Sequence, residues 1–257
     1  MGRRLRDKSG RGQRYLLPRF RRFRRRNLLA APPPPVEGEL GADYVPSPDD
    51  FLPSPPKPIS RLNQKPNIAS IKPALFCFAL FWLCSLHDWL SPDADGLWAS
   101  NEAVIGEHQY WRLLTALFVH SDIGHLLANS PLFLIFGWFL YAFFGWLAFP
   151  ASALIIGTLS NLVTIYFYPP DTELLGASGM LYGMVALWLV VYVRHENTLP
   201  WGVRLLRAVG VSLLLLFPTT FREETSYTAH LAGFVIGIAV GFIGFRGPSK
   251  TTRTDFY

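Results

Sequence analysis

Charged residues are scarce in this sequence, at 16% of 257 residues, whereas a soluble domain usually has about 25%. Half of the residues are hydrophobic. This composition excludes an ordinary soluble protein, and it also excludes a chain that is disordered throughout, because disorder requires low hydrophobicity. Cysteine is scarcer still: Cys77 and Cys84 are too few for a disulfide scaffold or a Cys-rich zinc module. Both lie in an apolar run, where we interpret them as small hydrophobic side chains.

The first 70 residues differ in composition from the rest of the chain. Residues 1–30 hold eleven Arg and one Lys against a single acid, and residues 31–70 hold eleven Pro with no apolar periodicity. We interpret residues 1–70 as a disordered, basic and Pro-rich cytosolic tail, because such a segment cannot bury enough apolar surface to fold. Contact with anionic lipid headgroups is a second interpretation of its charge, and an organellar transit peptide is a third. Nucleic acid is not an expected partner.

Long apolar runs separated by short polar segments begin after Ser70. A helix needs about 20 apolar residues to cross a bilayer, whereas a barrel strand needs about 10 residues of alternating polarity. The runs are too long and too uniformly apolar for strands, so the sequence predicts an all-α polytopic membrane protein, built as a bundle of six transmembrane helices over 71–245. A short cytosolic tail over 246–257 follows. The predicted helices cover residues 71–90, 123–144, 147–168, 177–193, 202–219 and 227–245.

The charges of the connecting segments predict the orientation of these helices, since Lys and Arg gather on the cytosolic side of a membrane. The tail, the segment near residues 193–207 and the C-terminus are basic, and the segments on the opposite side are mainly acidic. We therefore expect a multi-pass protein with both termini in the cytosol. A bacterial inner membrane is the expected location, and an organellar membrane is the alternative.

Polar side chains inside a membrane span are costly and indicate function, and two of them fall at the same depth. Ser178 lies 16 residues before Arg194, and His230 lies 16 residues before Arg246. Both predicted helices run toward the cytosol, so both side chains are expected about 24 Å above the cytosolic interface. A serine beside a histidine base is the minimum for nucleophilic catalysis.

Glycines at helical spacing predict that the helices carrying Ser178 and His230 pack together. Gly179 and Gly183 lie on one face of the first helix, and Gly233 and Gly237 lie on the face of the second that holds His230. Small residues at this spacing let membrane helices approach closely. On the helix over 123–144, His125 and Asn129 are four residues apart and therefore share a face near the same membrane side.

Four motifs, in order along residues 71–245, resemble those of the rhomboid intramembrane serine proteases. The sequence Gly176-Ala177-Ser178-Gly179, followed by Tyr182 and Gly183, is similar to the family's GxSG motif. The other three are His230 with its glycine ladder, the H-x4-H-x3-N pattern of His120, His125 and Asn129, and the Trp111-Arg112 pair.

The resemblance implies an endopeptidase that uses a Ser–His dyad to cleave membrane-protein substrates in or near their transmembrane segments. It implies Ser178 as nucleophile and His230 as general base. It further implies an oxyanion site with His125, Asn129 and the Ser178 N–H, and stabilising roles for Gly176 and for Tyr182, which would stack on His230. Trp111, Arg112 and the glycines 179, 183, 233 and 237 would be structural, and His120 would support a loop. No cofactor and no metal is expected.

Three other classes of function compete with this interpretation. A non-catalytic rhomboid-like adaptor would lack the serine or the histidine, and both are present. A transporter would usually show internal repeats, and none is visible. Metal-dependent intramembrane proteolysis would need an H-E-x-x-H motif, and aspartyl proteolysis would need two carboxylates inside spans. The sequence contains neither arrangement.

Overall fold

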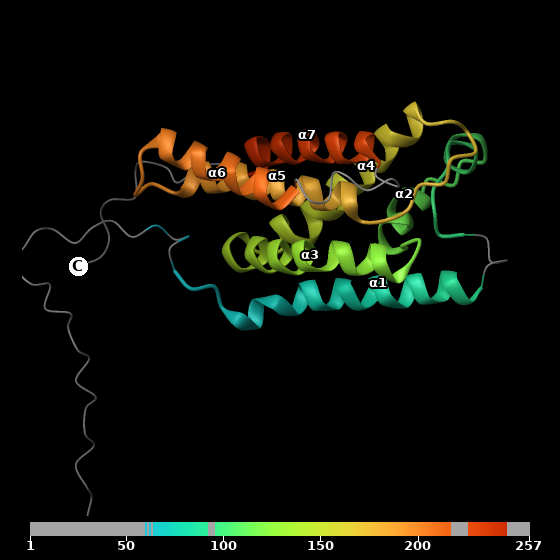
Figure 1. Cartoon of the computed structure of the whole chain (residues 1–257), viewed down its shortest axis with the longest axis horizontal. Coiled ribbons are helices and arrows are strands. Elements are labelled where there is room, and N and C mark those ends of the chain that lie inside the picture. The colour runs from blue at the N-terminus through green and yellow to red at the C-terminus, as the bar shows by residue number, and fades with distance from the viewer. Residues whose placement is uncertain (1–59, 61, 63, 92–95, 217–225, 246–257) are drawn as a thin grey trace, which may run out of the picture. The chain divides into compact units, whose positions relative to one another are not determined.

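The computed structural model describes residues 60, 62, 64–91, 96–216 and 226–245, and these residues are largely helical (Figure 1). The long helices are α1 (Lys72–Leu90), α3 (Ile123–Phe144), α4 (Ala153–Phe167), α5 (Ser178–His195), α6 (Trp201–Leu216) and α7 (Tyr227–Gly244). The shorter elements are η3 (Ile68–Ile71), η4 (Glu102–Gly106), α2 (Arg112–Thr115), η5 (Ala116–Phe118) and η6 (Leu147–Ser152). Besides these helices, the described residues include an isolated antiparallel β-bridge between Ala99 and Leu174.

Helices stand at all six positions predicted from the sequence. Within the described residues, four helical segments are long and apolar enough to cross a membrane: Ile68–Leu90, Ile123–Phe144, Leu147–Phe167 and Tyr227–Gly244. Helix α5 has 18 residues but ends in Arg194 and His195, and α6 has 16 residues up to Leu216, where the described residues stop. The helical polytopic class is therefore confirmed, while the count of six membrane crossings stays a prediction.

The predicted helix over 147–168 is kinked near its beginning. Phe149, which lies inside η6, has φ −147° and ψ 132°, and these are extended values. The cause is Pro150, because proline disfavours the helical conformation in the residue before it. The predicted span over 147–168 therefore corresponds to the apolar segment Leu147–Phe167, but the kink was not predicted, and the regular α-helix begins at Ala153.

The predicted tail lies mostly outside the described residues. Its last part includes η3, whose first turn is capped by the side chain of Asn67, and the indole of Trp138 donates a 2.9 Å hydrogen bond to the Asn67 carbonyl. This end of the segment therefore packs on α3. The boundary at residue 70 and the disorder of the preceding residues stay predictions.

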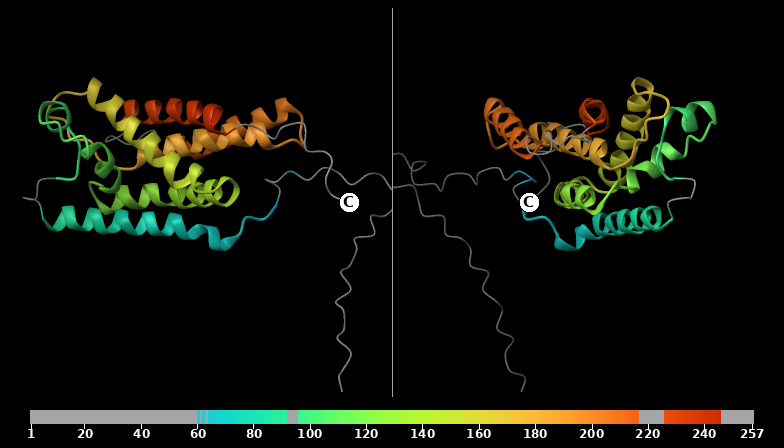
Figure 2. Two further views of the ribbon diagram at one scale, coloured as in Figure 1. Left: turned by 180° about the vertical axis from the view of Figure 1, so that it is seen from behind. Right: turned by 45° about the vertical axis from the view of Figure 1, so that its right-hand side comes forward.

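Helix α5 is the centre of the bundle. It contacts α3, α4, α6 and α7, and the views in Figures 1 and 2 show these helices on different sides of it. Side chains of α5 are buried on nearly every face, including Met184 and Leu187. A helix that is apolar all round is expected where a helix is surrounded by others.

The backbones of α5 and α7 touch at two pairs of glycines. A Cβ atom on Gly233 would overlap the carbonyl oxygen of Gly179, and one on Gly237 would overlap that of Gly183. A Cβ on Gly183 would in turn lie 2.8 Å from the Gly233 carbonyl oxygen. The close approach predicted from the glycine spacing is therefore present, and no larger residue fits there without separating the helices.

Replacing Gly237 by valine should push α7 away from α5, since its side chain would meet the Gly183 backbone. We expect a loss of about 1–3 kcal/mol in the free energy of unfolding, the usual cost of overpacking. Thermal unfolding in detergent measures it. Gly244→Val on the same helix is the matched control, because a Cβ atom on Gly244 would meet no neighbouring helix within 4 Å in the described part of the chain. Equal melting temperatures for the two variants would contradict the prediction.

Candidate active site

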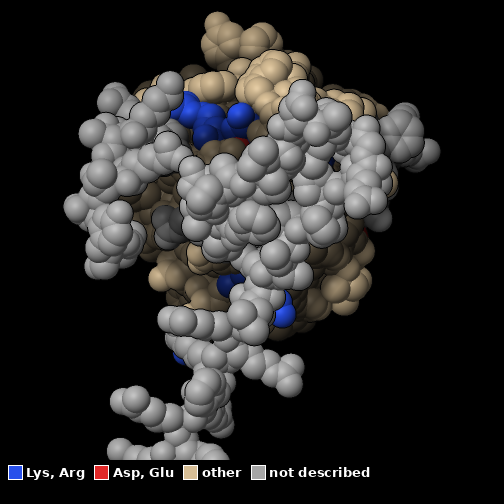
Figure 3. Space-filling model, turned by 90° about the vertical axis from the view of Figure 1, so that its left-hand side faces the viewer, with Lys and Arg blue, Asp and Glu red and all other residues tan. Residues whose placement is uncertain are grey.

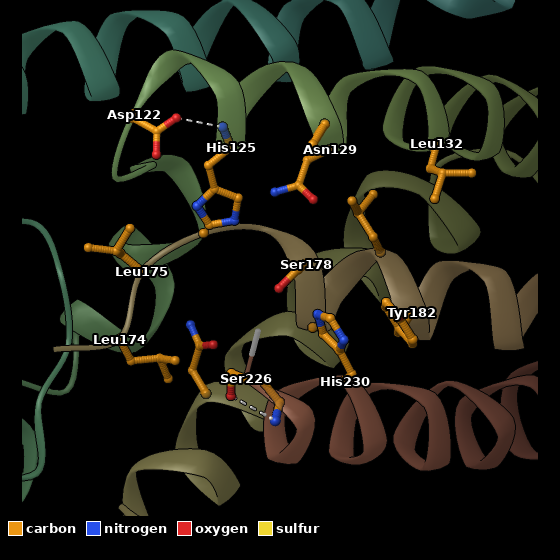
Figure 4. Close-up of a pocket in the computed structure, with 16 residues that line it drawn as sticks. Asp122, His125, Asn129, Leu132, Leu174, Leu175, Ser178, Tyr182, Ser226 and His230 are labelled. Carbon is orange, nitrogen blue, oxygen red and sulfur yellow. Dashed lines mark hydrogen bonds between the residues drawn. The ribbon is translucent and has the colours of Figure 1, made fainter. Parts of the chain in front are cut away.

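A cavity of about 360 Å³ opens among α3, α4, α5, α7 and the segment that leads into α5 (Figure 4). Six residues singled out from the sequence as catalytic or stabilising lie in its wall: His125, Asn129, Gly176, Ser178, Tyr182 and His230. The other lining residues are Asp122, Ala128, Leu132, Asn161, Leu174, Leu175, Gly179, Leu181, Ser226 and Ala229. Residues from four separate segments of the chain thus face one space.

Ser178 is the first residue of α5, and its hydroxyl points into the cavity (Figure 4). The segment before it is held by backbone hydrogen bonds: Leu174 pairs with Ala99, and the N–H of Gly176 donates to the Ala116 carbonyl at 2.9 Å. The N-cap residue Ala177 supplies no side-chain acceptor to the first turn. The first N–H groups of a helix have no partner within the helix, so this turn presents donors and a positive dipole end beside Ser178.

His230 lies in the first turn of α7 and is 7% exposed. Its ring stacks on Tyr182, with centroids 3.8 Å apart and planes at 15°. Within the described residues its Nδ1 atom is buried and makes no hydrogen bond, and none joins the ring to Ser178. The Ser178 hydroxyl and the His230 ring nevertheless face the same space in Figure 4. Among the described residues, the contact that orients the ring is therefore its stacking on Tyr182.

His125 and Asn129 approach the cavity from α3. The Nδ2 atom of Asn129 is buried and without a partner among the described residues, so it is a donor directed at the cavity. The His125 ring contacts the Ser121 hydroxyl through Nδ1 at 3.2 Å. Its other edge packs on Gly176, which has φ +104° and where a Cβ would lie 2.8 Å from the ring. Only glycine combines this backbone conformation with that contact.

Asp122 explains why α3 begins where it does. Its carboxylate caps the helix by accepting the backbone N–H of His125 at 2.9 Å, and it also accepts the Ser121 hydroxyl at 3.0 Å. These hydrogen bonds favour the charged form and lower the pKa of Asp122. The cap fixes the first turn of α3, and this fixes the position of His125 in that turn.

His120 lies outside the cavity wall, in the loop before α3. It is fully buried, its backbone N–H donates to the Ser85 hydroxyl at 3.1 Å, and its carbonyl accepts the Trp89 indole at 2.7 Å. Its ring meets that of His125 edge-on with centroids 5.2 Å apart. These hydrogen bonds to residues of α1 hold the loop that leads into α3, so His120 supports this loop. Burial, and to a lesser extent the nearby His125, lowers the pKa of His120 to about 3.

Trp111 and Arg112 also lie away from the cavity wall. The buried Arg112 guanidinium donates to the carbonyls of Gly96 and Trp98 and to the Gln109 side chain. It also lies over the Trp111 ring, 4.9 Å from its centroid. These contacts tie together the segment between α1 and α3. Trp111 itself is 49% exposed.

Sequence reasoning missed several residues that build the site. Asn161 lines the cavity and donates from Nδ2 to the Leu113 carbonyl at 2.9 Å. Asp122 and Ser226 are N-caps of α3 and α7, and a cap signature before an apolar run was available for both. Ser160 donates to the Ala229 carbonyl at 2.8 Å, a contact that no local pattern predicts. Among the described residues no group of three His, Cys, Asp or Glu side chains converges as a metal site would require.

The fold and this cavity define a helical integral membrane protein in which a serine and a histidine from two adjacent helices face one space. Comparison with known proteins agrees with this class. The chain belongs to the rhomboid family, because residues 107–247 match the model of the Rhomboid domain.

Three relatives illustrate the similarity. RHOMBOID-like protein 2 of Arabidopsis thaliana is 30% identical over 160 residues, which are 59% of this chain and 49% of that protein. Rhomboid protease GlpG of Haemophilus influenzae is 28% identical over 144 residues, 53% of this chain and 71% of that protein. Rhomboid-like protease 2 of Toxoplasma gondii is 23% identical over 133 residues, which are 52% of this chain and 47% of that protein. The chain thus spans about half the length of the first and third of these curated relatives.

Acid should destabilise the protein through His120. The pKa of this residue is lowered to about 3 in the folded state, against about 6.5 when unfolded, so between these values the unfolded state binds more protons. The contribution of His120 to the free energy of unfolding is fully present above pH 6.5. It is lost progressively as the pH decreases from 6.5 toward 3. We expect a loss of about 2 kcal/mol from this group between pH 7 and pH 5.

Unfolding in detergent at pH 7 and pH 5 measures this loss for the unchanged protein and for His120→Gln. Between pH 7 and pH 5, the free energy of unfolding of His120→Gln should fall by about 2 kcal/mol less than that of the unchanged protein. His108→Gln, at an exposed position of the preceding loop, is the control and should keep the original dependence. A His120→Gln protein as acid-sensitive as the original would show that His120 is not the group responsible.

Proposed function

We propose that this protein is an intramembrane serine endopeptidase that hydrolyses peptide bonds in or near transmembrane segments of membrane-protein substrates. One observation carries the proposal: Ser178 at the start of α5 and His230 in the first turn of α7 line the same cavity, on two helices in backbone contact. Membership of the rhomboid family and the names of the two relatives called proteases support it. No cofactor is required for this chemistry.

In the proposed reaction, the Ser178 hydroxyl attacks the carbonyl carbon of the scissile bond while His230 accepts its proton. The tetrahedral intermediate collapses when His230 returns that proton to the leaving amine, and an ester to Ser178 remains. Water then attacks the ester with His230 again as base, which releases the carboxyl product and restores the serine. The stacked Tyr182 holds the ring through both half-reactions.

Three kinds of donor surround the place where negative charge would develop on the substrate oxygen. The Asn129 amide is an unpartnered donor at the cavity, and the His125 ring lies beside Gly176 on the same side. The first turn of α5 adds backbone N–H groups at Ser178. Donors fixed in place before reaction stabilise an oxyanion without reorganisation, and we propose that these groups do so.

We further propose that both termini face the cytosol. Arg194 and Arg204 lie at the end of the bundle where α5 stops and α6 starts, and Arg204 donates to the carbonyl of Val193 at 2.8 Å. Figure 3 views this end of the molecule, where Lys and Arg side chains are visible in a hollow. Basic residues on one side of a membrane protein favour the cytosolic face. On this proposal the cavity lies toward the opposite side, and the lipid bilayer and transmembrane substrates are the partners.

Replacing Ser178 or His230 by alanine should abolish cleavage of a transmembrane peptide substrate while the protein stays folded. The two losses should not add in the double variant, because the pair acts as one unit. Purified protein with a fluorogenic substrate in detergent measures this, together with covalent labelling by a fluorophosphonate probe. Ser212→Ala, whose hydroxyl bonds its own helix at Ala208, is the control. Near-normal turnover by Ser178→Ala would make the proposal wrong.

Asn129→Ala should lower turnover by about 10²–10³-fold, the usual effect of removing one oxyanion donor. The decrease should fall on kcat, because the donor acts on charge that develops in the transition state. Asn197→Ala, at an exposed position after α5, is the matched control and should keep full activity. An unchanged kcat in Asn129→Ala would remove this residue from the mechanism.

A further inference from the structure

The orientation of His230 needs a source other than a hydrogen-bonded side chain. Its Nδ1 atom is buried and makes no hydrogen bond within the described residues. Catalytic histidines commonly have a third group that orients the ring, as the aspartate does in a Ser-His-Asp triad. Stacking on Tyr182 sets the plane of the ring. It does not set the position of the backbone that carries the ring, so that position must be fixed by the packing of α7.

Helix α4 holds the first turn of α7 through two hydroxyl contacts. Tyr168, the C-cap residue of α4, shares a 2.7 Å hydrogen bond with the hydroxyl of Ser226, the N-cap residue of α7. The Ser226 hydroxyl also accepts the backbone N–H of Ala229 at 3.2 Å. Further along α4, Ser160 donates to the carbonyl of Ala229 at 2.8 Å. Both contacts end on the turn that immediately precedes His230.

The same turn is coupled directly to the histidine. The backbone N–H of His230 donates to the Ser226 carbonyl at 3.1 Å, so a shift of Ser226 moves His230 with it. Ser226 lies at the cavity, and Figure 4 shows its hydroxyl bonded to the α7 backbone near His230. Tyr168 is not among the residues of the cavity wall. Within the described residues, the hydrogen bond of its hydroxyl links it to the cavity through Ser226.

We propose that Tyr168 and Ser226 are positioning residues for the general base. Their hydrogen bond fixes the start of α7 against α4, while the glycine contact fixes the same helix against α5. Together the two contacts place His230 across the cavity from Ser178, and within the described residues no carboxylate takes part. A displacement of reacting groups by about 1 Å can lower a rate about 100-fold, so loss of one contact has a measurable effect on catalysis. This inference rests on the proposed protease function.

The chain offers variants that isolate the contact. Tyr168→Phe removes one oxygen atom and keeps the ring, and Tyr166→Phe makes the same change at a position that is 77% exposed. Ser226→Ala removes both the contact and the helix cap, whereas Ser226→Thr keeps a hydroxyl that can serve both. For each full-length variant in detergent, we would measure kcat and KM with a fluorogenic transmembrane peptide. The rate of fluorophosphonate labelling and the melting temperature complete the set.

Tyr168→Phe is expected to lower kcat and the labelling rate about ten-fold, with KM changed less than about two-fold. Ser226→Ala should lose at least as much and also melt earlier, since it loses the cap, and Ser226→Thr should recover most of the activity. The double variant should be no slower than Ser226→Ala alone, because both changes break the same bond. Tyr166→Phe should match the unchanged protein.

Equal kcat and labelling rates for Tyr168→Phe and the unchanged protein would overturn the inference while leaving the protease function intact. An effect confined to KM, or an equal loss in Tyr166→Phe, would overturn it as well. If the unchanged protein neither cleaves the peptide nor reacts with the probe, the proposed function itself fails. The two failures are therefore distinguished by the unchanged protein alone.

Discussion

Helices α5 and α7 are in direct backbone contact, and the position of the site follows from this contact. In a bilayer, apolar side chains gain little by leaving lipid for protein, so helices associate through close packing and hydrogen bonds. Gly179 against Gly233 and Gly183 against Gly237 allow an approach that any side chain would prevent. This contact brings the first turns of both helices to one level, and each first turn carries one of the two residues of the proposed dyad.

Several polar groups inside the bundle bond to the backbone of another element. Ser160 donates to α7, Asn161 donates to α2, and Ser85 donates to the Phe118 carbonyl in η5 at 3.3 Å. An unpaired polar group in hydrocarbon costs several kcal/mol, so such contacts cross-link the helices. Four buried side-chain nitrogens have no hydrogen-bond partner among the described residues. Those of Asn129 and His230 belong to residues of the cavity wall, whereas Nε2 of His120 and Nε of Arg204 lie outside it.

Much of the helical framework was predictable, because long apolar runs and polar breaks are local properties of a chain. The prediction for α3 matched its observed bounds, Ile123–Phe144, and the glycine stripes predicted the pairing of α5 with α7. The kink at Phe149 was missed although Pro150 signals it, because hydropathy alone does not register backbone conformation. The two helices whose membrane crossing stays a prediction are α5 and α6. Helix α5 begins with Ser178, the proposed nucleophile.

Residue type, helical period and rise per residue are local quantities, so the sequence identified which side chains are available for chemistry and how far along each helix they lie. Their depth in the membrane stays a prediction. The sequence did not determine that Tyr168 meets Ser226 or that Asn161 reaches the carbonyl of Leu113. These contacts join residues 58 and 48 positions apart, and they exist only when the loops between helices have closed. Only the tertiary structure decided them, because a hydrogen bond depends on fractions of an ångström between groups that no sequence pattern links.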